Sequence, residues 1–349
     1  MKNRILAVLL ASTLSVLAVS CSNTNETSAP TTAQNETTTI VETTEADVTT
    51  VDVTDTVTET EADETTAPAD EKPSQDRQGN DIVIPDEIEN IASLAGSITE
   101  ILVDLGHGDN IVAIDLYSSG FEGVASDTPA IDMMSPDIET LLSLDLDIVF
   151  ASNISDAGSE DSVFQQLIDA GITVAYIPTA NSLEDIRLDI EFIGLAVGAT
   201  AETEALLSNF DTQLDELATI GSSIPEAEKQ SVLFEISALP AIYSTGSGSF
   251  LNEVIELIGA TNVLADESGW VPVTEESAIA LNPDVILTNV NYIEDPVGEI
   301  MGRPGWEAVT AIENEDVYPI DNSASSLPNH NVINAAWEIA RAVYPAYYN

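Results

Sequence analysis

The residue with the clearest chemical use is Cys21, the only cysteine in a chain of 349 residues. It follows Lys2, Arg4 and an apolar run from Ile5 to Val19 that only small hydroxyl residues interrupt. This order of charged, apolar and small residues is typical of a secretory signal peptide, and the run is too short to span a bilayer comfortably. Because a single thiol excludes a disulfide within the chain, its position directly after the signal indicates another use.

Residues 18 to 21, Ala-Val-Ser-Cys, resemble the lipobox of bacterial lipoproteins, in which the cysteine is acylated and becomes the new N-terminus. Leucine is usual three places before the cysteine, where this chain has Ala18. The resemblance implies a signal peptide over residues 1–20 and a diacylglyceryl group on Cys21, whose two acyl chains suffice for stable anchoring. The alternative is an ordinary signal peptide that is cleaved elsewhere and leaves Cys21 as a free thiol.

Residues 21–80 are expected to form a lipidated N-terminus followed by a disordered linker. The segment from Ser22 onward is dominated by Thr, Glu, Asp, Ser and Ala and has almost no aromatic or long aliphatic side chains. Such a composition cannot bury enough apolar surface to offset the entropy of ordering. Its negative charge favours an extended tether between the membrane and a folded body.

The charge balance excludes two classes of partner. The chain has 8 Lys and Arg against 61 Asp and Glu, a formal net charge of -53. Nucleic acids and anionic lipid headgroups both require basic patches, so neither is an expected partner.

Two glutamates occupy matching positions in an internal repeat. Glu139 lies near the start of a predicted helix and precedes Asp147, which begins a predicted strand, by the same offset that separates Glu276 from Asp284. Both helices end in a Leu-x-x-Asp step. We interpret this as one α/β unit used twice, with the two glutamates in equivalent places. The alternative is two solvated glutamates that are favoured only by the helix dipole.

Other candidate chemistry is weaker. A site that binds Zn or Mn directly uses several histidines and a carboxylate, but the chain has only His107 and His330, so no metal site is expected. Residues 246–249, Gly-Ser-Gly-Ser, follow a predicted strand like a phosphate loop but lack its Lys. We therefore expect no enzymatic activity, although a surface-anchored enzyme or an adhesin on the same scaffold remains an alternative.

The elements that would position these residues alternate between strand and helix from residue 81 onward. Residues 91–94 are a predicted strand, and residues 97–100, Ser-Ile-Thr-Glu, are a predicted capping box that opens a helix through Leu105. Residues 111–114 form the next predicted strand. This alternation is typical of a mainly parallel sheet covered by helices.

Residues 181–222 carry helical periodicity and no strand signal. The apolar positions are Leu183, Ile186, Ile190, Ile193, Val197, Leu206, Phe210, Leu214 and Leu217. A long helix here would connect an N-terminal α/β lobe, residues 81–180, stiffly to a C-terminal α/β lobe, residues 223–349. The alternative is two ordinary helices within one lobe. The predicted fold class is thus α/β, with mainly parallel central sheets in two lobes and a ligand cleft between them.

The order and spacing of these motifs resemble the helical-backbone class of substrate-binding proteins of ABC importers, which serves iron-siderophores, haem and cobalamin. The segments that carry the resemblance are 97–102 with 105–106, 138–149, 246–250, 258–263, 270–276, 282–285, Trp306 and 317–318. Together they span nearly all of residues 91–345.

The resemblance implies an extracellular solute-binding receptor, anchored to the cell membrane through Cys21, that delivers a cobalamin-like or iron-chelate ligand to an ABC transporter permease. It implies a monomer without a cofactor of its own, whose ligand can itself carry a metal. One surface glutamate per lobe would dock onto arginines of the permease. By position these are Glu139 and Glu276, and such complementary rim charges would steer and orient the encounter.

In this family the ligand lies against loops at the carboxyl ends of strands, where open α/β sheets generally bind ligands. Carried over by position, the candidates are Ser97, Tyr117, Met133, Asn153, Tyr243, Trp270, Asn291 and His330. Trp270 is the strongest because its ring offers a flat apolar face with one hydrogen-bond donor. Many relatives have Arg-Pro followed by a further arginine where residues 327–331 read Leu-Pro-Asn-His-Asn, which favours a neutral or zwitterionic ligand over a strongly anionic ferric chelate.

Overall fold

The computed structural model describes residues 72–152 and 164–348. The N-terminal half is built on a five-stranded parallel sheet of order β3-β2-β1-β4-β5. Its strands are β1 (Ile91–Leu94), β2 (Ile111–Asp115), β3 (Ala130–Ile131), β4 (Ile148–Ser152) and β5 (Thr173–Ile177). The central strands β1 and β4 are buried along their whole length, as expected for a parallel sheet covered on both faces.

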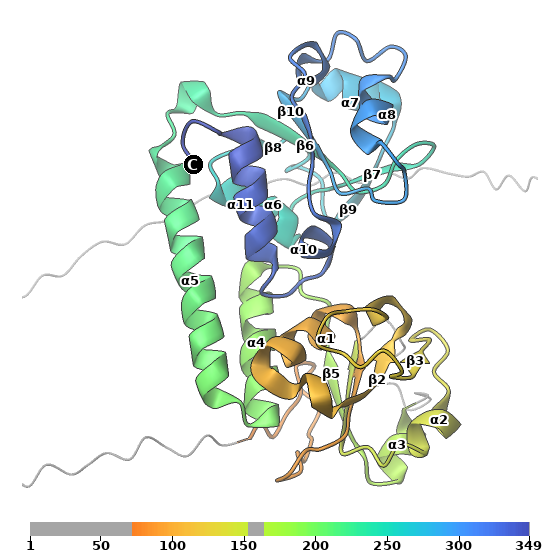
Figure 1. The fold of residues 1–349 in the computed structure, drawn as a ribbon. Coiled ribbons are helices and arrows are strands. Elements are labelled where there is room, and N and C mark those ends of the chain that lie inside the picture. The colour runs from red at the N-terminus through yellow and green to blue at the C-terminus, as the bar shows by residue number, and fades with distance from the viewer. Residues whose placement is uncertain (1–71, 153–163, 349) are drawn as a thin grey trace, which may run out of the picture. The chain divides into compact units, whose positions relative to one another are not determined.

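Short helices connect these strands (Figure 1). They are α1 (Gly96–Leu102), η1 (Val103–His107), η2 (Gly108–Asn110), η3 (Leu116–Ser118), α2 (Ile138–Leu142) and α3 (Gln165–Asp169). The capping box predicted at residues 97–100 is wrong: the N-cap is Ala95, which makes no side-chain cap bond. The Thr99 hydroxyl instead forms a hydrogen bond of 2.8 Å with the hydroxyl of Ser93, in the central strand β1.

Residues 72–80, which the sequence analysis places in the linker, pack against the folded part of the chain. Asp76 is buried, and its carboxylate accepts hydrogen bonds from backbone N–H groups of its own turn and of Tyr176. Arg77 Nε donates to Asp189 Oδ1 at 2.6 Å. The expected boundary at residue 80 therefore lies several residues too late. The polar side chains of this segment resemble those of the linker, but here they accept backbone hydrogen bonds and pair with a buried carboxylate.

Two helices, rather than one, occupy the connecting segment. They are α4 (Leu183–Val197) and α5 (Thr200–Ser223), separated at Gly198, which adopts a left-handed conformation (φ 76°) that ends α4. The long helix α5 contacts α4 and η1 of the N-terminal half, and the helices α6 (Phe250–Leu257) and α11 (Val332–Val343) of the C-terminal half. The predicted long helix between the halves is thus found in α5, but it begins at Thr200 rather than at residue 181. The first part of the segment forms α4, which packs against α1 of the N-terminal half.

The C-terminal half has a four-stranded parallel sheet of order β11-β10-β6-β8 and an antiparallel pair, β7 with β9. The strands are β6 (Ser231–Glu235), β7 (Ile242–Thr245), β8 (Thr261–Asn262), β9 (Trp270–Val273), β10 (Val285–Thr288) and β11 (Val317–Pro319). The helices are α6 (Phe250–Leu257), α7 (Glu275–Leu281), α8 (Pro296–Met301), α9 (Thr310–Glu313), α10 (Asn322–Ser326) and α11 (Val332–Val343), with the single turn η5 (Glu226–Glu228) before β6. The predicted fold class, α/β with two sets of mainly parallel strands, is confirmed.

The apolar core follows the two faces of each sheet. Alternate residues of β1 and β4 point into a core shared with α4, α5, α6 and α11, and the residues between them point into a separate cluster on the outer face. Strands β6 and β10 alternate in the same way between the shared core and a third cluster around Trp306. The two halves are thus joined by continuous apolar packing along the long helix.

The internal repeat is visible in the backbone. Asp147 Oδ2 accepts the N–H of Asn90 at 2.9 Å, and Asp284 Oδ2 accepts the N–H of Ser231 at 2.9 Å. The N–H groups of the same two aspartates donate back to the carbonyl oxygens of the same two partners, each at 3.0 Å. In both halves, an aspartate at the amino end of one strand therefore fixes the start of its parallel neighbour.

The turn before each of these aspartates is also the same. Asp145 (φ 49°) and Asn282 (φ 46°) both adopt the left-handed conformation, at the same offset before Asp147 and Asp284. Asp and Asn tolerate this conformation better than other residues with a Cβ. The repeat thus extends from the two short helices, α2 and α7, through the turn and into the strand.

Two close backbone approaches hold α5 at its ends. A Cβ on Gly194 of α4 would lie 1.8 Å from Thr203 Oγ1, near the start of α5. A Cβ on Gly221 would lie 2.3 Å from the carbonyl oxygen of Leu257, at the end of α6. Only glycine permits these contacts, so α5 is packed tightly against both halves. None of the helices in residues 72–152 and 164–348 combines the length and apolar character needed to cross a bilayer.

Candidate ligand-binding site

A cavity of about 300 Å³ lies at the carboxyl ends of strands β1, β2, β4 and β5. Its lining residues are Ala95, Gly96, Ser97, Ile98, Asp115, Tyr117, Met133, Ser152, Ile177, Pro178, Thr179, Ala180, Asp189, Ser326, Leu327 and Pro328. Most of this lining is apolar. The position agrees with the rule that open parallel sheets bind ligands beyond the carboxyl ends of their strands.

One side of the cavity comes from the C-terminal half. Residues 326–328 connect α10 to α11 and lie across the strand ends of the N-terminal sheet. Asn289, which follows β10, holds the start of this connection: its Nδ2 donates to the hydroxyls of Ser325 at 2.9 Å and Ser326 at 3.1 Å. The cavity is therefore enclosed by both halves of the molecule.

Two carboxylates lie in the cavity wall. Asp115 is almost completely buried, and its carboxylate accepts the N–H of Tyr117 at 2.8 Å and the hydroxyl of Ser118. Burial raises the pKa of Asp189 to about 6, and the hydrogen bond and charge of the Arg77 guanidinium act in the opposite direction. The wall therefore presents negative or neutral oxygen acceptors to a ligand.

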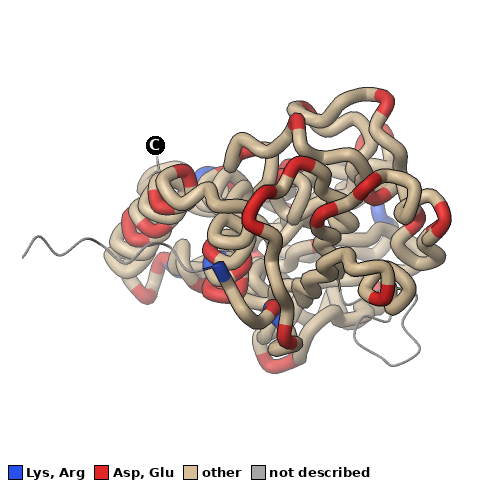
Figure 2. The backbone as a smooth tube through the Cα atoms, turned by 90° about the horizontal axis from the view of Figure 1, so that it is seen from below, with Lys and Arg blue, Asp and Glu red and all other residues tan. Residues whose placement is uncertain are grey.

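No lysine or arginine is among the described residues that line the cavity. The Lys and Arg residues of the described ranges are Lys72, Arg77, Arg187, Lys229, Arg303 and Arg341. Lys72 donates to backbone carbonyls, Arg341 stacks on Trp337, and the others pair with carboxylates. These cations are isolated among many Asp and Glu positions (Figure 2). Within the described ranges, no group of three or more His, Cys, Asp and Glu could hold a metal ion.

Three of the predicted ligand-binding residues, Ser97, Tyr117 and Met133, line this cavity. Ser97 lies in the first turn of α1, while the other two follow β2 and β3. The Tyr117 side chain is 81% exposed and so is available to a ligand. Asn153 lies outside the described residues.

The predicted residues of the C-terminal half lie elsewhere. Trp270 and Tyr243 belong to the antiparallel pair β9 and β7 and are 55% and 40% exposed. Asn291 is exposed in the loop after β10, next to Tyr292, which is 66% exposed. This half therefore presents exposed aromatic rings, but its predicted residues do not line the cavity.

His330 is placed in a different environment from the one expected of a ligand contact. It is buried at the start of α11, with Nε2 2.5 Å from Asp104 Oδ2 of η1, and it does not line the cavity. His107, the other histidine, lies in the glycine-flanked turn at the end of η1.

The predicted docking residues, Glu139 and Glu276, are both exposed and lie in the first turns of α2 and α7. The residue next to Glu276 has a different role: the Glu275 carboxylate accepts a hydrogen bond from the indole N–H of the buried Trp306 at 3.3 Å. The repeat thus places one free-standing glutamate on each half at an equivalent backbone position.

Sequence reasoning missed several cavity residues, of which Asp189 is the most informative. It lies on the buried face of α4 between Ile186 and Ile190, and a single acid on such an apolar face is a recognisable signal of a buried charge. Its partner, Arg77, lies within residues 21–80, which the sequence analysis assigns to the linker. The contribution of residues 177–180 and 326–328 depends on tertiary packing and had no local signal.

The family model described as periplasmic binding protein matches residues 91–324. The chain belongs to this family. The substrate-binding lipoprotein YvrC of an uncharacterized ABC transporter of Bacillus subtilis is 33% identical over 294 residues, which cover 80% of this chain and 91% of that relative.

Periplasmic binding proteins with named ligands are also similar. A vitamin B12-binding protein of Vibrio parahaemolyticus is 24% identical over 72% of this chain and 88% of its own. The crystal structure of a possible iron-binding protein from Staphylococcus epidermidis superimposes with a TM-score of 0.64 at 26% identity, covering 74% of this chain and 99% of that one. The predicted family is confirmed: the chain is a substrate-binding protein of an ABC transporter, with a small-molecule ligand and a permease as its partners.

Proposed function

We propose that this periplasmic binding protein captures a cobalamin-like or iron-chelate ligand of low net charge and delivers it to its permease. The observation that carries the proposal is the cavity wall, which combines apolar side chains with Asp115 and Asp189 and, among the residues that the structure describes, contains no lysine or arginine. An anionic ligand would meet unfavourable charge there, because buried like charges repel strongly at low dielectric. The protein acts as a receptor rather than an enzyme, and any metal arrives with the ligand.

The cavity of about 300 Å³ is at the lower end of the range for small-molecule sites. A corrinoid or a chelate that exceeds this volume would extend beyond the N-terminal half and contact the exposed rings of Tyr243, Trp270 and Tyr292. Aromatic faces suit such ligands because they offer large rigid apolar contact with little loss of side-chain entropy.

Calorimetry with cyanocobalamin, haemin, a neutral ferric hydroxamate and an anionic ferric catecholate tests the ligand class. We expect cyanocobalamin or the neutral hydroxamate to bind and the anionic catecholate not to bind. Tight binding of the catecholate alone would refute the assignment of ligand charge.

Trp270→Ala and Tyr117→Ala probe the two sides of the site. Each is expected to weaken binding of the same probe by about tenfold or more, since a lost aromatic contact costs on the order of 1.4 kcal/mol beyond lost area. Thermal unfolding is expected to change little because both side chains are exposed. Tyr344→Phe, which keeps the ring and lies away from the cavity, is the control for binding.

We further propose that Glu139 and Glu276 dock onto basic residues of the permease. Charge reversal, Glu139→Lys or Glu276→Lys, is expected to lower uptake about tenfold or more without changing ligand affinity, because rim charges mainly affect encounter and orientation. Glu313→Lys, on the exposed end of α9, is the control for a general change of charge. Equal loss of uptake in all three variants would contradict specific docking.

Cys21 is proposed to carry the lipid that holds the monomeric receptor at the extracellular face of the cell membrane. The B. subtilis relative is a lipoprotein, which supports this anchor. Cys21→Ser is expected to release the protein from washed membranes, and mass spectrometry of the membrane-bound form is expected to find diacylglyceryl on Cys21. A membrane-bound Cys21→Ser variant would contradict the proposal.

A further inference from the structure

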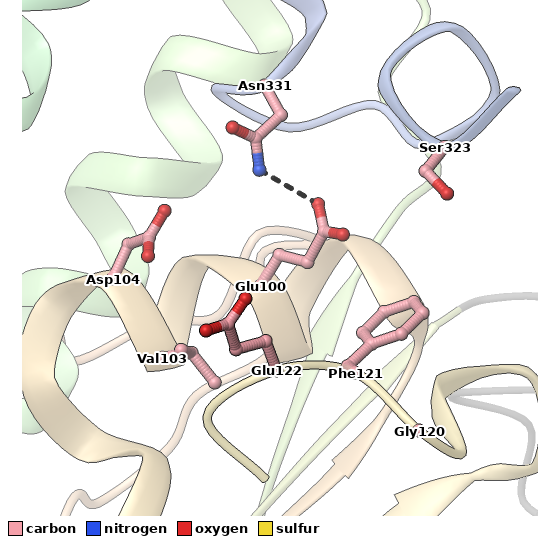
Figure 3. A pocket seen from close by; sticks show the side chains of 8 residues that line it. All are labelled: Glu100, Val103, Asp104, Gly120, Phe121, Glu122, Ser323 and Asn331. Carbon is pink, nitrogen blue, oxygen red and sulfur yellow. Dashed lines mark hydrogen bonds between the residues drawn. The ribbon is translucent and has the colours of Figure 1, made fainter. Parts of the chain in front are cut away.

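The loop that begins α11 is fastened to helix α1 by hydrogen bonds to one carboxylate. Glu100 Oε2 accepts Nδ2 of Asn329 at 2.7 Å and Nδ2 of Asn331 at 3.0 Å. Figure 3 shows Asn331 reaching toward Glu100 beside a pocket that also contains Asp104 and Glu122. Asn329 is completely buried, and its bond to a carboxylate is charge-assisted and therefore stronger than a bond between neutral groups.

A second contact lies one turn further along. His330 Nε2 is 2.5 Å from Asp104 Oδ2 of η1, the helical turn that continues α1. We call this set, Glu100 and Asp104 on one side and residues 329–331 on the other, the clasp. It joins parts of the chain separated by more than 220 positions, one from each half.

The clasp is continuous with both sides of the ligand cavity. Leu327 and Pro328 line the cavity and directly precede Asn329, whose N–H donates to the Leu327 carbonyl at 2.9 Å. Ser97 and Ile98 line the opposite side and belong to α1, the helix that carries Glu100. The distance between these two sides is therefore set where the clasp joins them.

The other end of the same loop is held by the C-terminal sheet. Asn322 Nδ2 donates to the carbonyl oxygen of Asn289 at 2.6 Å, and Asn289 Nδ2 donates back to Ser325 and Ser326 of α10. Residues 322–331 thus run from an attachment on the C-terminal half to an attachment on the N-terminal half. The clasp is the attachment that a separation of the halves would break.

We propose that Glu100 is a positioning residue for ligand capture: through Asn329 and Asn331 it holds Leu327 and Pro328 over the cavity and sets the separation of the two halves, without touching the ligand. A carboxylate oxygen can accept two donors at once, which is what this geometry requires. The inference rests on the proposed function only in taking this cavity as the ligand site.

The test compares Glu100→Ala with Glu100→Gln, which keeps one carbonyl acceptor, and with Glu122→Ala. Glu122 is a matched control, since it lines the same acidic pocket but makes no hydrogen bond to the loop among the described residues. Two readouts are used on the full chain: affinity for cyanocobalamin by calorimetry, and the distance distribution between spin labels at Ser143→Cys and Ala280→Cys in a Cys21→Ser background.

Glu100→Ala is expected to broaden the distance distribution in the ligand-free protein and to weaken cyanocobalamin binding at least tenfold, chiefly through faster dissociation. Glu100→Gln is expected to remain within about threefold of the unmodified protein, and Glu122→Ala to be unchanged. If Glu100→Ala does not fold, Asn331→Ala, which removes one of the two bonds, is expected to show an intermediate broadening.

An unchanged distance distribution in Glu100→Ala, or in Asn331→Ala where that variant is needed, would overturn the proposal. So would equal effects of Glu100→Ala and Glu122→Ala. If the unmodified protein does not bind cyanocobalamin, the affinity measurement bears on the proposed ligand alone, and the distance measurement, which needs no ligand, still decides whether the clasp holds the halves.

Discussion

In both halves of the molecule an aspartate fixes the start of a neighbouring strand by the same pair of hydrogen bonds, Asp147 to Asn90 and Asp284 to Ser231. The carboxyl ends of the same strands differ. In the N-terminal half they surround a cavity with buried carboxylates, and in the C-terminal half they lead to loops and a β7–β9 pair with exposed aromatic rings.

The repeated unit has two different requirements, one at the amino ends of its strands and one at the carboxyl ends. The amino ends of the strands carry the turn and the capping aspartate that the parallel pairing itself needs, so the two copies agree there. The carboxyl ends are open to ligand, and there each copy has its own side chains. The matching aspartates therefore reflect a shared requirement of folding, while the loops at the carboxyl ends can differ without disturbing the strand pairing.

The largest expected difference between the halves concerns their buried ion pairs. Arg303 forms a bidentate pair with Glu235 in which both side chains are 1% exposed. Arg303→Ala leaves that carboxylate buried and unpaired and is expected to lower the free energy of unfolding by about 3–5 kcal/mol. Arg77→Ala is expected to cost less, about 1–2 kcal/mol, because the Arg77 side chain is 22% exposed and water can partly replace it beside Asp189.

Urea unfolding of both variants tests this ranking. Arg187→Ala, whose pair with Asp211 is partly exposed, is the control and is expected to cost at most about 1 kcal/mol. If Arg77→Ala proved as costly as Arg303→Ala, the buried charge of the N-terminal half would be as tightly held as that of the C-terminal half.

The repeated aspartates should have matching effects. Asp147→Ala leaves the N–H groups of Glu89 and Asn90 without their carboxylate acceptor, and Asp284→Ala leaves the N–H and hydroxyl of Ser231 without theirs. Each is expected to lower the free energy of unfolding by about 2 kcal/mol. Calorimetric unfolding measures both. A difference of more than about 1 kcal/mol would show that the two copies of the repeat are not energetically equivalent.

A smaller, pH-dependent effect is expected from Asp189 in the N-terminal half. The pKa of folded Asp189 is about 6 and its ordinary value is 3.8, so between these pH values the folded protein binds more protons than the unfolded chain. The free energy of unfolding therefore decreases as pH rises through this range, by up to about 1.4 kcal/mol per pH unit from this group.

Unfolding of the native sequence and of Asp189→Asn from pH 4 to 7 isolates this contribution. The variant is expected to lack the decrease, while Asp185→Asn, on the exposed side of the same helix turn, retains it. Parallel curves for all three proteins would show that Asp189 is ionised throughout this range.

The sequence was sufficient for the architecture because its evidence is local and repeated. The strands at residues 91–94 and 111–114, and the equivalence of Asp147 and Asp284, were predicted from apolar runs and matching offsets. The helix that carries Glu276 was likewise predicted, and the structure shows that it begins with a capping box between Thr274 and Ser277.

The site was harder to predict because its residues converge from distant segments. Ser97, Tyr117 and Met133, predicted as ligand contacts from the family's use of strand-end loops, line the cavity. Leu327 and Pro328 line the cavity from a loop that is hydrogen-bonded to Asn289 and Glu100, and no local pattern encodes those distant contacts. The capping box at residues 97–100 failed because Glu100 and Thr99 serve tertiary contacts instead.

The glycine contacts at the two ends of α5 determine how the molecule can deform. Near its start, the Thr203 side chain of α5 packs directly against Gly194 of α4. Near its end, Gly221 packs directly against the carbonyl oxygen of Leu257, so a shift of α5 toward either neighbour would bring atoms into collision. Both ends of α5 are held by these contacts, so a change in the angle between the halves requires the part of the helix between them to bend. Helices curve gently at small energetic cost but resist sharp kinks in the absence of proline, so bending of α5 is expected to allow only small changes in this angle.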